Sequence, residues 1–96
     1  MIKVSVNYPA TEGASFDHDY YKNSHVPLAQ EIWSPAKAEI DKGLPGQPNV
    51  AAVHFYFESM DAFQAAMGSP RAGELMADVA NYTSIAPTMQ ISEVVS

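Results

Sequence analysis

The sequence contains no cysteine, few basic residues and no long apolar run, and each absence removes a class of protein. Without cysteine the chain can form no disulfide, no thiolate-bound metal site and no iron–sulfur cluster. Its five Lys and Arg residues are scattered among eleven Asp and Glu, for a formal net charge of −6. Because phosphate binding requires clustered Lys and Arg, we expect no nucleic-acid partner.

Long apolar runs are missing as well. No stretch approaches the roughly 18 apolar residues that a membrane-spanning helix needs, so we expect no membrane partner. The first residues, Met1 to Val4, already belong to a strand pattern and do not resemble a charged leader segment. These observations predict a cytoplasmic protein.

The sequence signatures of metal and cofactor sites are also missing. There is no glycine-rich phosphate loop, no zinc-ligand spacing and no Ser-His-Asp signature. Asp17, His18 and Asp19 are metal-ligand types, but within one helical turn their side chains point apart. We therefore predict no metal and no cofactor; haem, held by His25 or His54, is a minor alternative.

What the sequence does contain is enough for one small domain over residues 1–96. A chain of this length buries only about 60–65% of its unfolded surface and is modestly stable alone. With 47% hydrophobic residues, it carries more apolar material than one small core hides comfortably. Association of two copies is the expected source of further buried area, so we predict a homodimer.

Four segments have the pattern of β-strands, with apolar side chains at every second position or a run of β-branched and aromatic residues. In chain order they are residues 2–8, 36–42, 50–57 and 88–95. The second alternates weakly and is a candidate edge strand. The third is the strongest of the four.

A helical pattern follows the first strand. Ser15 is a candidate N-cap for a helix over residues 16–24. Pro27 cannot continue that helix but can begin another, so we expect a junction there. The second helical piece is expected to end near Trp33.

A second helical pattern follows the third strand. Ser59 is a candidate N-cap, and Gly68 is expected to end the first segment. The next segment is expected to carry Leu75, Met76 and Val79 along one face.

The element order β-α-β-β-α-β predicts an α+β domain with the ferredoxin-like arrangement, a four-stranded antiparallel sheet with both helical segments on one face. The opposite face would carry residues such as Ala52 and Tyr56, which are too apolar to prefer water. A second copy of the chain is the expected cover.

Several segments, taken in order, resemble the EthD family, named for ethyl tert-butyl ether degradation. These segments are Tyr8-Pro9, Phe16-Asp17-His18-Asp19-Tyr20-Tyr21, His25-Val26-Pro27-Leu28, Phe55-Tyr56-Phe57-Glu58-Ser59, Asp61-Ala62-Phe63 and Ala77-Asp78-Val79-Ala80-Asn81-Tyr82. The resemblance implies a dimeric α+β barrel, in which two ferredoxin-like protomers pack sheet to sheet. Relatives on this scaffold include cofactor-free monooxygenases and polyketide cyclases. Tyr82 is a departure, because the family often has Phe there.

His25 is the candidate catalytic residue. It lies beside the expected junction at Pro27, where an imidazole could act as general acid or base. The alternative is that it caps carbonyl groups at the helix end and holds the junction. The resemblance to the family at His25 and Pro27 strengthens the functional interpretation.

Six further residues are candidates for substrate binding. They are Tyr8, Tyr21, Trp33, His54, Asp78 and Tyr82. Tyr21 is one helical turn from His25, so the two side chains can touch. Most of the aromatic rings have core packing as their simpler role, and Tyr8 and Trp33 are the best candidates to line a pocket.

Two of these candidates have strong structural alternatives. His54 is either a hydrogen-bonded interface residue or a second polar anchor in a cavity. Asp78, placed unfavourably near a helix C-terminus, makes either a structural hydrogen bond or a catalytic one. The polar positions of the alternating strands carry Ser5, Asn7 and Gln90. We expect these side chains to form a hydrogen-bonded layer at an interface.

Two functions are compatible with these residues. One is a cofactor-free catalyst that acts on a small hydrophobic molecule, aromatic or polyketide-like, with His25 as acid or base. The other is a non-catalytic protein that binds such a compound or delivers it to a partner oxygenase.

Overall fold

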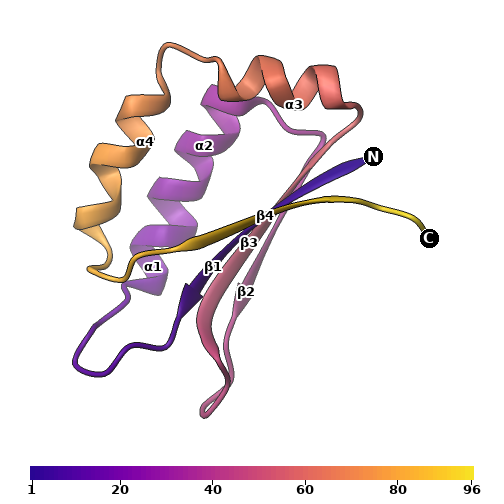
Figure 1. Cartoon of the computed structure of the whole chain (residues 1–96). Helices are drawn as coiled ribbons and strands as arrows, with labels where there is room; N and C mark the ends of the chain where they lie inside the picture. Colours follow the sequence, from indigo (N-terminus) through magenta and orange to yellow (C-terminus); the bar gives the residue numbers. More distant parts are fainter.

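The computed structural model describes residues 1–96, arranged as one sheet with a layer of helices on one face (Figure 1). The strands are β1 (Ile2–Pro9), β2 (Lys37–Lys42), β3 (Asn49–Phe57) and β4 (Thr88–Glu93). All pairs are antiparallel, in the order β2-β3-β1-β4. The predicted ferredoxin-like α+β fold is therefore confirmed.

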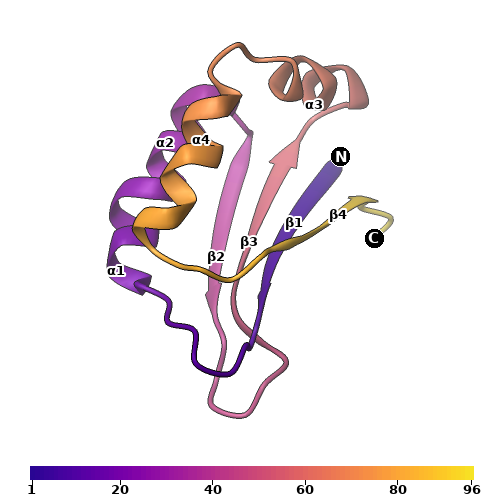
Figure 2. The same ribbon diagram turned by 60° about the vertical axis from the view of Figure 1, so that its left-hand side comes forward.

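The helices lie together on one side of the sheet, and the turned view shows the other face uncovered (Figure 2). In chain order they are α1 (His18–Tyr20), a π-turn (Tyr21–His25), α2 (Val26–Trp33), α3 (Met60–Met67), α4 (Ala72–Asp78) and a 3-10 turn (Val79–Asn81). None of them combines the length and the apolar character that a membrane crossing requires.

The core forms over the two central strands. Val4 pairs with Phe55 and Val6 with Val53, and all four side chains are buried. Alternation along the strands places them on the face that the helices cover. Each such side chain stabilises the fold by about 1.5–3 kcal/mol on leaving water.

The edge strands are more exposed, and β2 is the edge strand that the sequence indicates. β4 ends at Glu93, short of the expected Val95, because Glu93 pairs with Ile2, the first residue of β1. The Val94 N–H still donates to the Met1 carbonyl at 2.9 Å, and β1 offers no residue beyond that point.

The first helix begins after Asp17, and the expectation that Ser15 caps it is wrong. Phe16 forms an isolated β-bridge with Thr83, which keeps the chain extended up to that point. Asp17 then acts as the N-cap, because its Oδ1 accepts a hydrogen bond from the Tyr20 N–H at 3.0 Å.

Pro27 does not break the helix, so the expectation of a junction between two helical pieces there is also wrong. The preceding π-turn carries a bond from the Val26 N–H to the Tyr21 carbonyl, and the backbone stays helical at His25 and Val26. Pro27 then lies in the first turn of α2, where its missing N–H has little cost. The result is a continuous helix with one widened turn.

The second helical layer follows the sequence pattern more closely. The Ser59 Oγ accepts from the Ala62 N–H at 3.1 Å, and Gly68 is the C-cap of α3. In α4, Leu75 is buried, but Met76 is 77% exposed rather than on the same face. Adjacent helical residues point about 100° apart, so only one of the two can face the sheet.

Replacing Ser59 with Ala tests the assigned cap of α3. We expect a loss of about 1 kcal/mol in the free energy of unfolding, because the Ala62 N–H loses its acceptor. Ser59→Asp keeps an acceptor at this position and should remain close to the wild type. Urea unfolding monitored by circular dichroism provides the midpoints, and equal midpoints for all three chains would contradict the cap.

Candidate functional site

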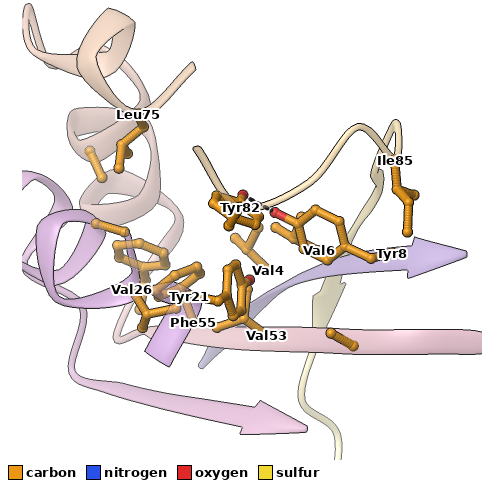
Figure 3. Packing of buried hydrophobic residues seen from close by; sticks show 14 of the residues in the cluster. Val4, Val6, Tyr8, Tyr21, Val26, Val53, Phe55, Leu75, Tyr82 and Ile85 are labelled. Atoms are coloured by element: carbon orange, nitrogen blue, oxygen red, sulfur yellow. Dashed lines mark hydrogen bonds between the residues drawn. The ribbon is translucent and has the colours of Figure 1, made fainter. Parts of the chain in front are cut away.

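An apolar cavity of about 240 Å³ lies between the helix layer and the sheet. Side chains from β1 and β3 form its floor, and the first helix and α4 supply most of the opposite wall. Figure 3 shows the buried core beside it, with Tyr21 of the first helix facing Val53 and Phe55 of the sheet. No charged Lys, Arg, Asp or Glu side chain lines the cavity.

One stripe of the first helix supplies four lining residues. Tyr21, His25, Ala29 and Trp33 follow one another at four-residue spacing, so they share a helix face. Three of the four side chains are rings, and Ala29 contributes only a methyl group. The rings of Tyr21 and His25 stack, with centroids 5.5 Å apart and planes within 16°.

Asp78 holds the imidazole of His25. Its Oδ2 is 2.8 Å from the His25 Nδ1, and both side chains are largely buried. Two further donors reach the same carboxylate at Oδ1, the Tyr20 hydroxyl at 2.7 Å and the Asn81 side-chain amide at 3.0 Å. The unfavourable position of an acid near a helix C-terminus is thus offset by three hydrogen bonds.

These contacts keep Asp78 ionised. Burial raises the pKa of its carboxyl, but hydrogen bonds from Tyr20, Asn81 and His25 lower it further, so the pKa lies below its ordinary value. A carboxylate accepts rather than donates, so a neutral His25 carries its proton on Nδ1. Nε2 then has a free lone pair, and it makes no hydrogen bond within the chain.

Three tyrosines pack against one another beside this pair. The Tyr8 and Tyr82 hydroxyls hydrogen-bond each other at 2.6 Å, and their oxygens face one another in Figure 3. Burial raises the pKa of Tyr8, Tyr21 and Tyr82, so all three are neutral phenols at physiological pH. Tyr82 also packs on His25, with ring centroids 4.6 Å apart.

Two buried polar atoms have no hydrogen-bond partner, the Tyr21 hydroxyl and the Trp33 Nε1. Both residues line the cavity. Tyr8 contributes to the raised pKa of Tyr21. The Tyr8 hydroxyl nevertheless does not form a hydrogen bond of normal geometry with the Tyr21 hydroxyl.

His54 lies on the uncovered face of the sheet and does not line this cavity. Its Nδ1 is 2.8 Å from the Ser5 Oγ, and its Nε2 is 2.9 Å from Asp41 Oδ2. Although this is a Ser-His-Asp row, Ser5 lies mid-strand between two paired neighbours, where the backbone N–H groups are used in the sheet. The row therefore has no oxyanion hole of the kind that acyl transfer requires.

The uncovered face is more polar than the sequence argument assumed. The Tyr56 hydroxyl donates to Glu39 at 2.7 Å, and the Lys3 and Lys37 ammonium groups lie 5.9 and 5.4 Å from its ring centroid. A shallow hollow of about 470 Å³ lies on this face and at its C-terminal edge. Its lining is mainly polar, unlike that of the apolar cavity beneath the helices.

The structure thus brings most of the sequence candidates together. Tyr8, Tyr21, His25 and Trp33 line one cavity, while Asp78 and Tyr82 are bonded to residues of that group. Sequence reasoning missed Asn81 and the role of Tyr20 as donors to Asp78. It also missed Ala29, although its four-residue spacing from His25 was a usable signal. No group of three or more His, Asp or Glu side chains is arranged to hold a metal ion.

Comparison with known proteins identifies the family. The model of the EthD domain matches residues 11–86. An uncharacterized 11.0 kDa protein from the thcB-thcC intergenic region of Rhodococcus erythropolis is 36% identical over 99 residues, covering 97% of this chain and 94% of that protein. The crystal structure of an EthD-like protein from Ralstonia eutropha JMP134 is 45% identical, with a TM-score of 0.88, and the match covers 99% of this chain and 92% of that one.

More distant structures share the fold alone. A dimeric protein with a ferredoxin-like fold from Bacteroides fragilis has a TM-score of 0.64 at 16% identity, covering 97% of this chain and 95% of that one. SnoaB, a cofactor-independent oxygenase from Streptomyces nogalater, has a TM-score of 0.66 at 11% identity, covering 99% and 94%. The family match, the relative in Rhodococcus and the structure from Ralstonia each span most of the chain, and they show that this protein belongs to the EthD family.

Proposed function

We propose that the protein binds a small hydrophobic compound in the cavity and acts on it by acid–base catalysis, with His25 as the catalytic residue. The observation that carries this proposal is the pairing of His25 with Asp78. A carboxylate at 2.8 Å holds one ring nitrogen and leaves the other free on a residue that lines an apolar cavity. Such an arrangement sets the tautomer and orientation of a general base.

The surroundings of His25 suit proton transfer. The cavity has no cation or carboxylate in its lining, so an apolar molecule enters without desolvating a charge. After His25 takes a proton, the Asp78 carboxylate stabilises the imidazolium that results. One well-placed acid–base group of this kind accelerates a reaction by about 10²–10⁴-fold.

The fold is compatible with such chemistry but does not select it. The cofactor-independent oxygenase SnoaB has this fold, and likeness at 11% identity supports the scaffold alone. The assignment to this chain therefore rests on His25, Asp78 and the cavity. The alternative that experiments must distinguish from catalysis is that the protein binds its ligand without changing it chemically.

A Kemp elimination of nitrobenzisoxazole tests whether His25 is a usable base. In this reaction a base takes the ring C–H proton, the N–O bond breaks, and a coloured cyanophenolate forms. We expect His25→Ala to lower the protein-dependent rate by about 10²-fold, because the base that borders the cavity is lost. The rate is followed by the absorbance of the phenolate.

His18→Ala is the matched control. His18 lies at the start of α1, outside the cavity, and burial lowers its pKa, so it is an imidazole that is neutral at physiological pH but does not border the cavity. Its removal should leave the rate unchanged. Equal rates for wild type and His25→Ala would overturn the catalytic role, and retained binding of the probe would then favour a binding protein.

Asp78→Asn tests the carboxylate that holds His25. We expect a loss of about 1–2 kcal/mol in the free energy of unfolding at neutral pH, since three donors lose a charged acceptor. The folded pKa of Asp78 lies below its unfolded value of about 3.8, so its stabilisation is complete above that value and is lost as pH falls through the folded pKa.

Urea midpoints of wild type and Asp78→Asn should accordingly differ most near neutral pH and converge in strong acid. The matched control is Asp19→Asn, which alters an exposed acid in the first turn of the same helix as His25. A gap that persists unchanged at low pH would show that the carboxylate charge does not stabilise this site.

We also propose that two copies of the chain pair through the uncovered sheet face. The distant relative from Bacteroides fragilis, described as a dimeric protein with a ferredoxin-like fold, supports this arrangement. In this chain the face carries a prepared polar surface, with Ser5, His54 and Asp41 already hydrogen-bonded to one another. Satisfied polar groups of this kind can be buried at modest cost.

Light scattering at micromolar concentration tests the pairing. We expect twice the chain mass for the wild type, and a shift toward the chain mass for Ser5→Glu, which places a bulky charge at the centre of the face. Gln64→Glu makes the same charge change on an exposed position of α3 and should leave the mass unaltered. A wild-type protein of single chain mass would exclude the dimer.

A further inference from the structure

The apolar cavity is open to solvent on one side. Most of its lining is buried, including His25, Tyr21 and the side chains of β1 and β3 that form the floor. The exposed members of the lining are Met76 of α4, Pro87 just before β4 and Met89 of β4. Met76 is 77% exposed and Met89 is 54% exposed. A molecule that comes from solvent therefore meets these two methionines before it reaches His25.

The opening lies beside β4 because the helix layer stops short of this strand. Met89 pairs with Val6 of β1, so the two side chains point to the same face of the sheet. Val6 is buried beneath the helices, whereas Met89 is exposed. Ile91 pairs with Val4 in the same way and is 47% exposed, although Val4 is fully buried. The helices thus cover β1 and leave the same face of β4 open.

The volume of the cavity limits how much of a ligand it can enclose. The cavity measures about 240 Å³. An engineered apolar cavity of about 150 Å³ binds one benzene molecule, so the present one holds an aromatic ring with a short substituent. Its inner wall includes the rings of Tyr8, Tyr21 and Phe55, which suit an aromatic guest. A longer substituent extends through the opening and lies against Met76 and Met89.

Methionine is well suited to this position. Its unbranched thioether side chain has three rotatable bonds and adapts to ligands of different shape. Three of the five methionines, Met67, Met76 and Met89, border the cavity. The lining contains no Lys, Arg, Asp or Glu, so an apolar substituent meets no fixed charge at the opening.

We propose that the opening between Met76 and Met89 is the ligand entrance, and that these two residues determine how long an apolar substituent the protein accepts. The ligand is a neutral aromatic compound whose ring lies inside the cavity and whose alkyl tail extends past the two methionines. This inference rests on the proposed function, because it concerns the substrate of the same cavity. The entrance is on the helix side of the sheet, opposite to the face that we propose for pairing.

A series of 4-alkylphenols tests the entrance by tail length. Phenol, 4-ethylphenol, 4-butylphenol and 4-hexylphenol share one neutral ring and differ only in the tail. For the wild type we expect each methylene group to tighten binding by about twofold to fourfold, as apolar surface leaves water. Calorimetry provides the dissociation constants. Trp33 is the single tryptophan and borders the cavity, so a change in its fluorescence shows that the probe is inside.

The double variant Met76→Gln with Met89→Gln removes the apolar surface at the entrance, because glutamine is close to methionine in shape but polar. Both positions are exposed, so the fold should tolerate the change. We expect the affinity for 4-hexylphenol to fall by roughly 10-fold, since its tail loses apolar contacts, and the affinity for phenol to stay the same.

Met60→Gln is the matched control. Met60 is an exposed methionine at the start of α3 and does not line the cavity. The same substitution there should leave all four affinities unaltered. A loss of 4-hexylphenol binding as large as that of the double variant would show that the tail adheres to exposed methionines in general, and it would overturn the entrance.

Two further results would overturn the inference. One is a dependence on tail length that is the same in the double variant as in the wild type. The other is an equal loss of affinity for phenol and 4-hexylphenol, which would place the two methionines in the wall around the ring instead of at the entrance.

The proposed function can fail independently of this assignment. A tail effect of Met76 and Met89 with no dependence of the Kemp rate on His25 would retain the entrance and remove the catalysis. A Kemp rate that depends on His25, with no tail effect of the methionines, would remove only the entrance.

Discussion

The antiparallel pairing of β1 with β3 is the constraint on which the other elements depend. Val4 and Val6 lie opposite Phe55 and Val53, and this apolar surface is the one that the helices cover. The covering helix contributes three rings and the small methyl group of Ala29 to the wall of the cavity that lies above this surface.

Asp78 connects the two halves of the helix layer. It is the last residue of α4, yet its hydrogen bonds reach Tyr20 and His25 in the first helix. The carboxylate thereby joins segments more than fifty residues apart and orients the imidazole at the cavity wall. The same bonds that hold the helices together orient the imidazole for the proposed proton transfer, so stability and the proposed function depend on one residue.

Sequence patterns predicted the elements well where the signal was local. Alternation located the strands, and Ser59 capped α3 as its residue type indicates. The errors arose where distant contacts decided the outcome. Phe16 bridges to Thr83, far along the chain, which moved the helix start from Ser15 to Asp17. The path of the chain at Pro27 was set by a π-turn, which has no reliable sequence signal.

The candidate site divides in the same way. By itself, the sequence determined the fold class and the helical neighbourhood of Tyr21 and His25, because periodicity and spacing act within a few residues. Only the tertiary structure decided that Asp78 reaches His25 and that His54 lies on the opposite sheet face, away from it. It alone decided that the Tyr21 hydroxyl and the Trp33 Nε1 are buried without a hydrogen-bond partner. Hydrogen bonds between segments far apart in the chain depend on how the layers pack, and no local pattern encodes that packing.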